Sequence, residues 1–266
     1  MSAAVRELRL FLTALGFLTR LPVPAWVGWS PEQQAASARH LPTVGWLVGA
    51  LQALVLLAAA GLWPPAVAAW LAVAAGLLMT GVFHEDGLAD ACDGLGGGTS
   101  REHTLAIMKD SRIGSYGTAA LVVALALKAQ LLAALLGPQG WDAFERVPAV
   151  VLTLVAAHAA SRWTALLVMQ RLPYVREEGS GKFATLLLAP LSRPALLWAT
   201  AVAVLPLLLL GRSAAWLLVP ALLGLAWWAT VWLRRRLGGC TGDTLGAVQQ
   251  VAELLCLLAL TALAWA

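Results

Sequence analysis

Four carboxylates, Glu85, Asp86, Asp90 and Asp93, lie within nine residues directly after a long apolar run. If this segment is a helix, the last three follow one another at i, i+4 and i+7 and share one face, and we call them the acidic triad. Carboxylate oxygens of this kind suit a hard divalent cation such as Mg2+. Charge is costly inside a bilayer, so acids at the edge of an apolar run predict a site at the membrane surface. The alternative is a solvated helix end that binds nothing.

Further along the chain, two clusters carry positive charge. Lys109 and Arg112 could neutralise phosphates, and Asp110 between them could complete the metal site. Basic residues beside a membrane span also arise from topology alone. Arg176 and Lys182 frame a glycine-containing loop that suits a phosphate or a nucleotide, although simple solvation of the loop explains it equally well.

Ionisable residues also lie inside apolar segments. Arg162 is expected to face the bundle interior or a polar cavity, where a functional role is favoured. Asp243 opens the last apolar segment, and Glu253 lies about 15 Å further along the same helix, where an unpaired carboxylate is costly. Lys128 and Arg162 are the natural partners of Glu253, so a purely structural ion pair is the alternative to a substrate-binding role.

The composition of the chain indicates which kind of secondary structure carries these charged residues. Of 266 residues, 60% are hydrophobic and only 12% are charged, which indicates a polytopic membrane protein. No charged residue occurs from Leu41 to Phe83, and Trp63-Pro64-Pro65 divides this stretch into two spans of about twenty residues. We therefore predict an all-α fold with about seven transmembrane helices in one integral membrane domain over residues 1–266. The other five spans are predicted at 114–136, 147–170, 194–211, 213–233 and 245–266.

The placement of basic residues predicts the orientation. Fourteen of the 18 basic residues fall on one side of the predicted spans, which is cytoplasmic by the positive-inside rule. The loops of about 84–113 and 171–193 then share the cytoplasmic face of a prokaryotic inner membrane. Residues 5–21 are apolar with charged flanks and predict an interfacial helix rather than an eighth span. The net charge of +4 reflects this orientation and not nucleic-acid binding. The three cysteines have no CxxC spacing, which argues against a disulfide framework or a zinc site.

Four sequence motifs, in this order, resemble those of the cobalamin synthase family: FHEDGLADACDG, IMKDSRIGSYG, YVREEG and GGCTGDTLGA. The resemblance implies a Mg2+-dependent adenosylcobinamide-GDP ribazoletransferase of the last steps of vitamin B12 biosynthesis. Such an enzyme joins adenosylcobinamide-GDP to α-ribazole or its 5′-phosphate and releases GMP. Its partners are corrinoid and nucleotide substrates and membrane lipid, and a homo-oligomer is compatible with it.

Carried onto this chain, the resemblance and the clusters together give a candidate site. The expected metal ligands are Asp86, Asp90, Asp93, Asp110 and Asp243, with the acidic triad catalytic and Asp93 preferred as the base. The expected substrate-binding residues are Lys109, Arg112, Arg162, Arg176, Lys182 and Glu253. The family's usual residue at the position of Glu85 is leucine; this extra carboxylate flanks the acidic face and either modulates metal binding or faces water.

Two other functions fit the sequence less well. A CDP-alcohol phosphotransferase also uses clustered aspartates at a membrane surface, but the second pair of acids in its pattern has no counterpart after Asp93-Gly94. A cation-coupled transporter would place its acids near the bilayer midplane in two related halves. Here most acids cluster at one predicted surface.

Overall fold

The computed structural model describes residues 2–137, 143–175, 186, 189–210 and 216–265. Within these residues the fold is helical, apart from one isolated bridge between Tyr174 and Cys240, which confirms the predicted all-α class. Short 3-10 turns occupy Ala25–Val27 and Ala38–His40. The α-helices are α1 Ala3–Leu18, α2 Pro31–Ser37, α3 Leu41–Ala60, α4 Pro65–Thr80, α5 Phe83–Gly97, α6 Arg101–Ile107, α7 Ser115–Leu135, α8 Ala143–Met169, α10 Arg193–Leu209, α11 Leu218–Leu237 and α12 Gly242–Trp265.

The predicted membrane spans correspond to α3, α4, α7, α8, α10, α11 and α12. Among the described residues, four helical segments are by themselves long and apolar enough to cross a membrane, and the bent pair of α4 and α5 would make a fifth. The α10 helix is apolar but shorter. Helix α11 runs to Leu237, so the three arginines that follow the predicted span, Arg234 to Arg236, form the last turn of the helix.

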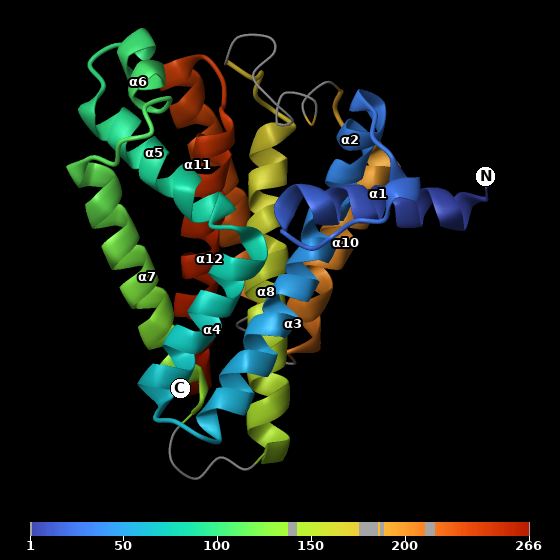
Figure 1. The fold of residues 1–266 in the computed structure, drawn as a ribbon, viewed down its shortest axis with the longest axis vertical. Helices are drawn as coiled ribbons and strands as arrows, with labels where there is room; N and C mark the ends of the chain where they lie inside the picture. Colours follow the sequence, from blue (N-terminus) through green and yellow to red (C-terminus); the bar gives the residue numbers. More distant parts are fainter. Residues whose placement is uncertain (1, 138–142, 176–185, 187–188, 211–215, 266) are drawn as a thin grey trace.

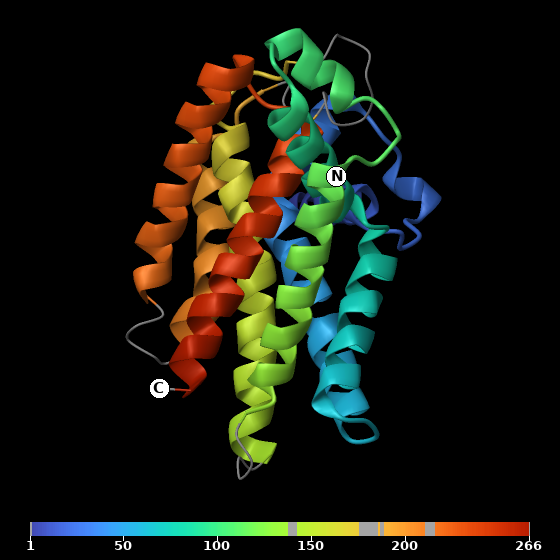
Figure 2. The same cartoon turned by 90° about the vertical axis from the view of Figure 1, so that its left-hand side faces the viewer.

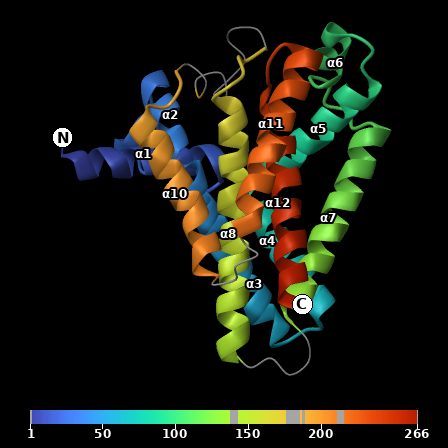
Figure 3. The same ribbon diagram turned by 180° about the vertical axis from the view of Figure 1, so that it is seen from behind.

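Helix α8 is the centre of the bundle and packs against α3, α10, α11 and α12 (Figures 1 and 3). Small residues make this close packing feasible. Gly45 and Gly49 of α3 face α8 so closely that a Cβ on either would lie 2.5 or 2.6 Å from a backbone oxygen of α8. The Gly-x3-Gly spacing thus joins the first long helix to the central one.

A sharp bend between α4 and α5 sets the direction of the acidic helix. The two helices meet at 89°, and both residues at the corner, Gly81 and Val82, have left-handed backbone angles with φ of 65° and 64°. This conformation is unfavourable for a β-branched residue such as Val82. The backbone N–H of Arg20 donates to the carbonyl of Met79 at 2.8 Å and ties the chain after α1 to this corner. The acidic triad is therefore helical, as predicted, but on a helix that turns away from the preceding span.

Helix α1 lies across the long helices rather than along them, as expected of an interfacial helix (Figure 1). Its Glu7 carboxylate lies 3.3 Å from Arg39 Nη1 and 3.1 Å from His40 Nε2, which fastens α1 to the start of α3. The short helices α2 and α6 were not predicted from the sequence. Ser30 and Ser100 cap them, accepting hydrogen bonds from Gln33 N and His103 N.

Candidate active site at the α5 and α12 end of the bundle

Helices α5 and α12 cross in direct backbone contact at one end of the bundle (Figures 1 and 2). A Cβ on Gly87 would lie 3.0 Å from Asp243 Cα and 3.3 Å from Gly246 Cα, so glycines at this crossing allow the close approach. The first turn of α12, with Asp243, is thereby brought against the first two turns of α5. Asp86 is exposed, whereas Asp90 and Asp243 are half-buried.

The start of α12 is fixed by a reciprocal pair of hydrogen bonds. Thr241 Oγ1 accepts from Thr244 N at 3.2 Å, and Thr244 Oγ1 accepts from Thr241 N at 2.9 Å, in the manner of a capping box. Asp243 lies in this first helical turn, where the helix dipole favours a negative charge.

The loop before α12 pairs with the segment after α8. Val175 N donates to Cys240 O at 3.1 Å and Cys240 N donates to Pro173 O at 2.9 Å. Gly239 is required here because a Cβ would meet Pro173 O. Burial raises the pKa of the Cys240 thiol to about 12, so it is an inert packing group. The structure thus brings the third and fourth sequence motifs together, although Arg176 and Lys182 themselves lie outside the described residues.

Asp93, the third member of the acidic triad, is hydrogen-bonded to the start of α7. Its Oδ2 accepts from Gly114 N at 2.7 Å and its Oδ1 accepts from Gly117 N at 2.8 Å, so it caps the start of α7. Glycine is needed at both positions because a Cβ would collide with the Asp93 carboxylate. The assignment of Asp93 as the base stays a prediction, and the structure adds that both of its oxygens accept hydrogen bonds that hold the start of α7.

Replacement of Asp93 by asparagine is expected to lower stability by about 2 kcal/mol, because an amide nitrogen would face one of the two backbone donors. The Mg2+ concentration that gives half-maximal activity should stay the same. Thermal unfolding in detergent and activity at varied Mg2+ measure the two effects. A folded Asp93→Asn protein of parental stability with a raised Mg2+ requirement would instead identify Asp93 as a metal ligand.

Asp110 pairs with Arg112 on the exposed connection between α6 and α7. Arg112 Nη2 lies 2.6 Å from Asp110 Oδ2, and hydrogen bonds from Arg112 lower the pKa of Asp110 to about 2. Within the part of the chain that the structure describes, no three His, Cys, Asp or Glu side chains come together as a metal-binding group. The structure thus does not bring the five expected aspartate ligands together, and Asp110 pairs with Arg112 instead. Lys109, beside this pair, is exposed.

Deeper in the bundle, five ionisable residues form what we call the buried charge cluster: Glu85, Lys128, His158, Arg162 and Glu253. Lys128 Nζ lies 2.8 Å from Glu253 Oε1 and 3.5 Å from Glu85 Oε1, and all three side chains are less than 10% exposed. His158 Nδ1 is 3.3 Å from Glu253 Oε2. With two acids and two permanent bases, the cluster is balanced in formal charge. The ion-pair alternative for Glu253 is therefore favoured over substrate binding, with Lys128 as its direct partner.

Three glutamines complete this network: Gln250, which the sequence places on the same helical face as Asp243 and Glu253, and Gln52 and Gln249, which the sequence analysis did not single out. Gln249 Nε2 donates to Glu253 Oε2 at 2.8 Å, and Gln52 Oε1 lies 2.8 Å from His158 Nε2. Gln250 Nε2 donates to Glu85 Oε1 at 3.1 Å and its Oε1 accepts from Lys128 at 3.1 Å. Amides inside otherwise apolar segments were the signal that could have revealed them.

Arg162 reaches the candidate site from α8. Its Nη1 donates to the His158 carbonyl at 3.0 Å, whereas its Nε is buried without a hydrogen-bond partner among the described residues. Arg162 and His84 line a cavity of about 40 Å³ at the start of α5, with Gly246 of α12 in the same wall. The predicted interior location of Arg162 is confirmed, and an unsatisfied guanidinium nitrogen beside a small cavity is consistent with a polar ligand or water there.

Glu85 is buried beside Lys128 and does not face water. Its replacement by leucine should nonetheless leave activity within about tenfold of the parental value, under about 1.4 kcal/mol of transition-state effect. Lys128 keeps its closer partner Glu253, and the Gln250 amide keeps Gln249 Oε1 at 2.8 Å. Steady-state turnover of the Glu85→Leu protein provides the measurement. Loss of activity comparable to that of an Asp86 variant would mean that Glu85 acts in the reaction.

Residues 10–261 match the family model described as cobalamin-5-phosphate synthase. A protein of Leptothrix cholodnii named adenosylcobinamide-GDP ribazoletransferase is 48% identical, covering 100% of this chain and 99% of the relative. Proteins of the same name from Ralstonia nicotianae and Shewanella piezotolerans are 46% and 42% identical, covering 100% and 96% of this chain and 99% and 95% of the relatives. No solved structure matches the chain. The family model and the full-length relatives agree, and the chain therefore belongs to the cobalamin-5-phosphate synthase family of membrane enzymes.

Proposed function

We propose that this protein joins adenosylcobinamide-GDP to α-ribazole or α-ribazole 5′-phosphate and releases GMP. The relatives' shared name supplies the reaction class. The structural observation that carries the proposal is the glycine contact between α5 and α12. It joins the acidic motif to the start of the last helix, which is distant in sequence, and so builds one polar surface at one end of the bundle.

In this proposal, one or two of the carboxylates of Asp86, Asp90 and Asp243 would hold Mg2+. Their carboxylate oxygens are suitable donors, and a protein commonly supplies only one or two carboxylates to Mg2+ while water and substrate phosphates complete the shell. The absence of a three-acid group among the described residues is compatible with such a shared site. The cation, when bound, would neutralise charge on the diphosphate.

The remaining groups would orient the substrates. Exposed Lys109 and the amino-terminal end of α12 favour a phosphate near the acids. A ribazole hydroxyl would attack the phosphorus nearer the cobinamide, the bond from that phosphorus to the oxygen of GMP would break, and GMP would leave. The hydroxyl proton would pass to a carboxylate of α5.

We further propose that this surface faces the cytoplasm, at the inner membrane. The three arginines at the end of α11 and the basic residues of the α6 and α7 connection lie at the same end as the acids, as the positive-inside rule expects of a cytoplasmic face. Nucleotide substrates made in the cytoplasm would then reach the acids without crossing the bilayer.

The test is release of GMP by the full-length protein in lipid nanodiscs supplied with adenosylcobinamide-GDP. Release should require both Mg2+ and an acceptor, with separate reactions distinguishing α-ribazole from its 5′-phosphate. A CDP-activated alcohol serves as the control for the competing class of enzyme. Release of GMP without any acceptor would mean hydrolysis, and release of CMP from the control would favour the phosphotransferase alternative.

A further inference from the structure

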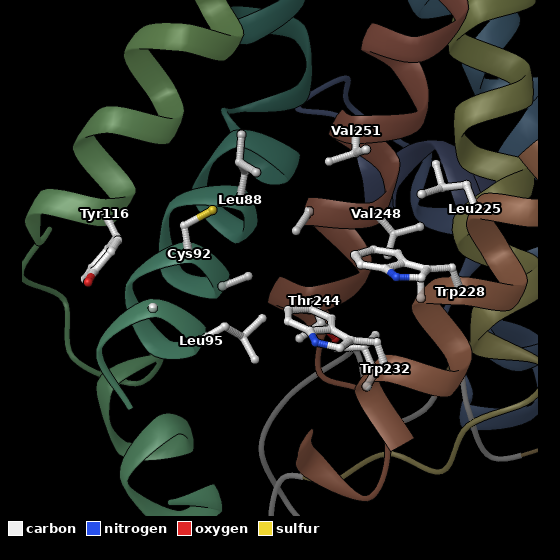
Figure 4. Close-up of a pocket in the computed structure, with 15 residues that line it drawn as sticks. Leu88, Cys92, Leu95, Tyr116, Leu225, Trp228, Trp232, Thr244, Val248 and Val251 are labelled. Atoms are coloured by element: carbon white, nitrogen blue, oxygen red, sulfur yellow. The ribbon is translucent and has the colours of Figure 1, made fainter. Parts of the chain in front are cut away.

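A long apolar groove runs along α12 on the opposite side of α5 from the acids. The part nearest the start of α12 has a volume of about 420 Å³ and lies between α5 and α11 (Figure 4). Leu88 and Leu95 of α5 form one wall, Trp228 and Trp232 of α11 form the other, and Val248 of α12 lies between them. The two indole rings stack with centroids 5.4 Å apart and planes 10° apart, which gives a flat, rigid wall. We call this hollow and its continuation the α12 groove.

The groove continues toward the middle of the bundle. A second hollow of about 400 Å³ shares Leu88 and Val251 with the first and extends between α7 and α12 to Leu254. Figure 2 shows α12 between α7 and α11, which form its two flanks. From Thr244 to Leu254 the lining covers a rise of about 15 Å, half of the roughly 30 Å hydrocarbon core of a bilayer. The groove therefore has the length of one membrane leaflet.

The acidic triad and the Gln250 side chain lie near the groove but are directed away from it or hydrogen-bonded to other residues. Leu88 and Leu95 lie on the face of α5 opposite to the acidic triad, by the helical period. The Gln250 side chain, which borders the second hollow between α7 and α12, is hydrogen-bonded to Glu85 and Lys128. What remains is a hydrocarbon-lined channel, open along the side of the bundle where Trp228 and Val251 are 53% and 45% exposed.

Positive charge stands at the end of the groove nearest the active-site surface. Arg236 Nη2 donates to the carbonyl of Leu95 at 3.3 Å and so spans from α11 to the opposite wall. Arg235 is exposed, and it follows the wall residue Trp232 by three positions on the same helix. Arg234, in contrast, donates to Arg171 O at 3.0 Å, toward the segment after α8. Two of the three arginines are therefore available at the mouth of the groove.

We propose that the α12 groove binds one anionic phospholipid of the cytoplasmic leaflet. One acyl chain lies along α12 between the indole wall and α5, and the phosphate headgroup meets Arg235 and Arg236. The apolar lining, the one-leaflet length and the two arginines at the mouth together select a lipid over a water-soluble ligand. The lipid packs against the face of α5 opposite the acids and so supports the helix that carries them. This inference does not depend on which reaction the protein catalyses.

The experiment uses the full-length protein in nanodiscs made from equal parts of phosphatidylglycerol and phosphatidylcholine. After gentle extraction, native mass spectrometry should detect one retained phosphatidylglycerol in excess over phosphatidylcholine. Arg235→Gln and Arg236→Gln should each lower this preference about fivefold, the effect of about 1 kcal/mol for one basic residue near a membrane surface. Arg234→Gln is the matched control and should leave the preference unchanged.

A second pair of variants tests the acyl-chain channel. Val251→Trp fills the groove, whereas Leu258→Trp adds the same side chain two turns further along α12, outside the groove lining, at a position of equal exposure (45% and 44%). Only the first should abolish lipid retention. Equal retention of both phospholipids by the parental protein, or retention unaffected by Val251→Trp, would overturn the proposal. So would a dimer that Val251→Trp dissociates while no lipid is retained, because the groove would then be an interface between two copies.

Discussion

Replacement of Asp86 or Asp90 by asparagine is expected to lower GMP release by a factor of about a hundred or more and to raise the Mg2+ requirement. Asparagine keeps the size of the side chain and removes its charge, so metal affinity falls while helix packing is preserved. Asp86 is exposed and Asp90 half-buried on α5, the helix whose Gly87 meets the start of α12. GMP release at varied Mg2+ concentrations measures both effects.

The matched control is Glu102→Gln, which removes an exposed carboxylate from α6 at the same end of the molecule. This change should leave both rate and Mg2+ requirement at parental values. Gel filtration in detergent establishes that each variant is folded. Parental turnover in both folded aspartate variants would exclude α5 as the catalytic helix.

The second large effect concerns stability. Lys128→Met is expected to lower the free energy of unfolding by about 3–5 kcal/mol, because two buried carboxylates lose the ammonium group that neutralises them. Glu253 and Glu85 lie 2.8 and 3.5 Å from that nitrogen. Unfolding by a denaturing detergent, followed by helix content, gives the measurement. Lys109→Met, the same change at an exposed position, is the control and should cost less than about 0.5 kcal/mol.

A double variant separates the ion pair from simple packing. When Glu253→Gln accompanies Lys128→Met, the loss should be smaller than the sum of the two single losses, since the neutral amide no longer requires a cation. Strictly additive losses would show that the two side chains stabilise the bundle independently, contrary to the proposed pairing.

The apolar segments and the acidic face could be predicted from sequence because both depend on local periodicity. The uncharged run from Leu41 to Phe83 became α3 and α4, and the acids after it became α5. The corner at Gly81 and Val82 could not be predicted, since a left-handed valine goes against local preference and is held there by the surrounding structure. Helix α11 continues past the predicted end of its span, because arginines that mark a membrane boundary can still be helical.

Side-chain partners were harder to predict than helices. Asp93 looked equivalent to Asp86 and Asp90 on the helical face, but in the structure its two oxygens accept hydrogen bonds from Gly114 N and Gly117 N at the start of α7. Likewise, Glu85 was expected to modulate the metal or face water, and only the packing of α7 and α12 against α5 places Lys128 beside it. Such tertiary contacts leave no periodic trace in the sequence.

The buried charge cluster has a consequence for how the protein is made. Lys128 belongs to α7, whereas its closest partner Glu253 belongs to α12, which is synthesised much later than α7. A lysine at the centre of a helix raises its apparent insertion free energy by about 2.5–3.5 kcal/mol. Until α12 arrives, Glu85 is the only acid of the cluster already synthesised that can offset this cost. Insertion of α12 therefore completes the neutralisation of Lys128, and a chain whose synthesis stops before α12 leaves this lysine without its closest acid partner.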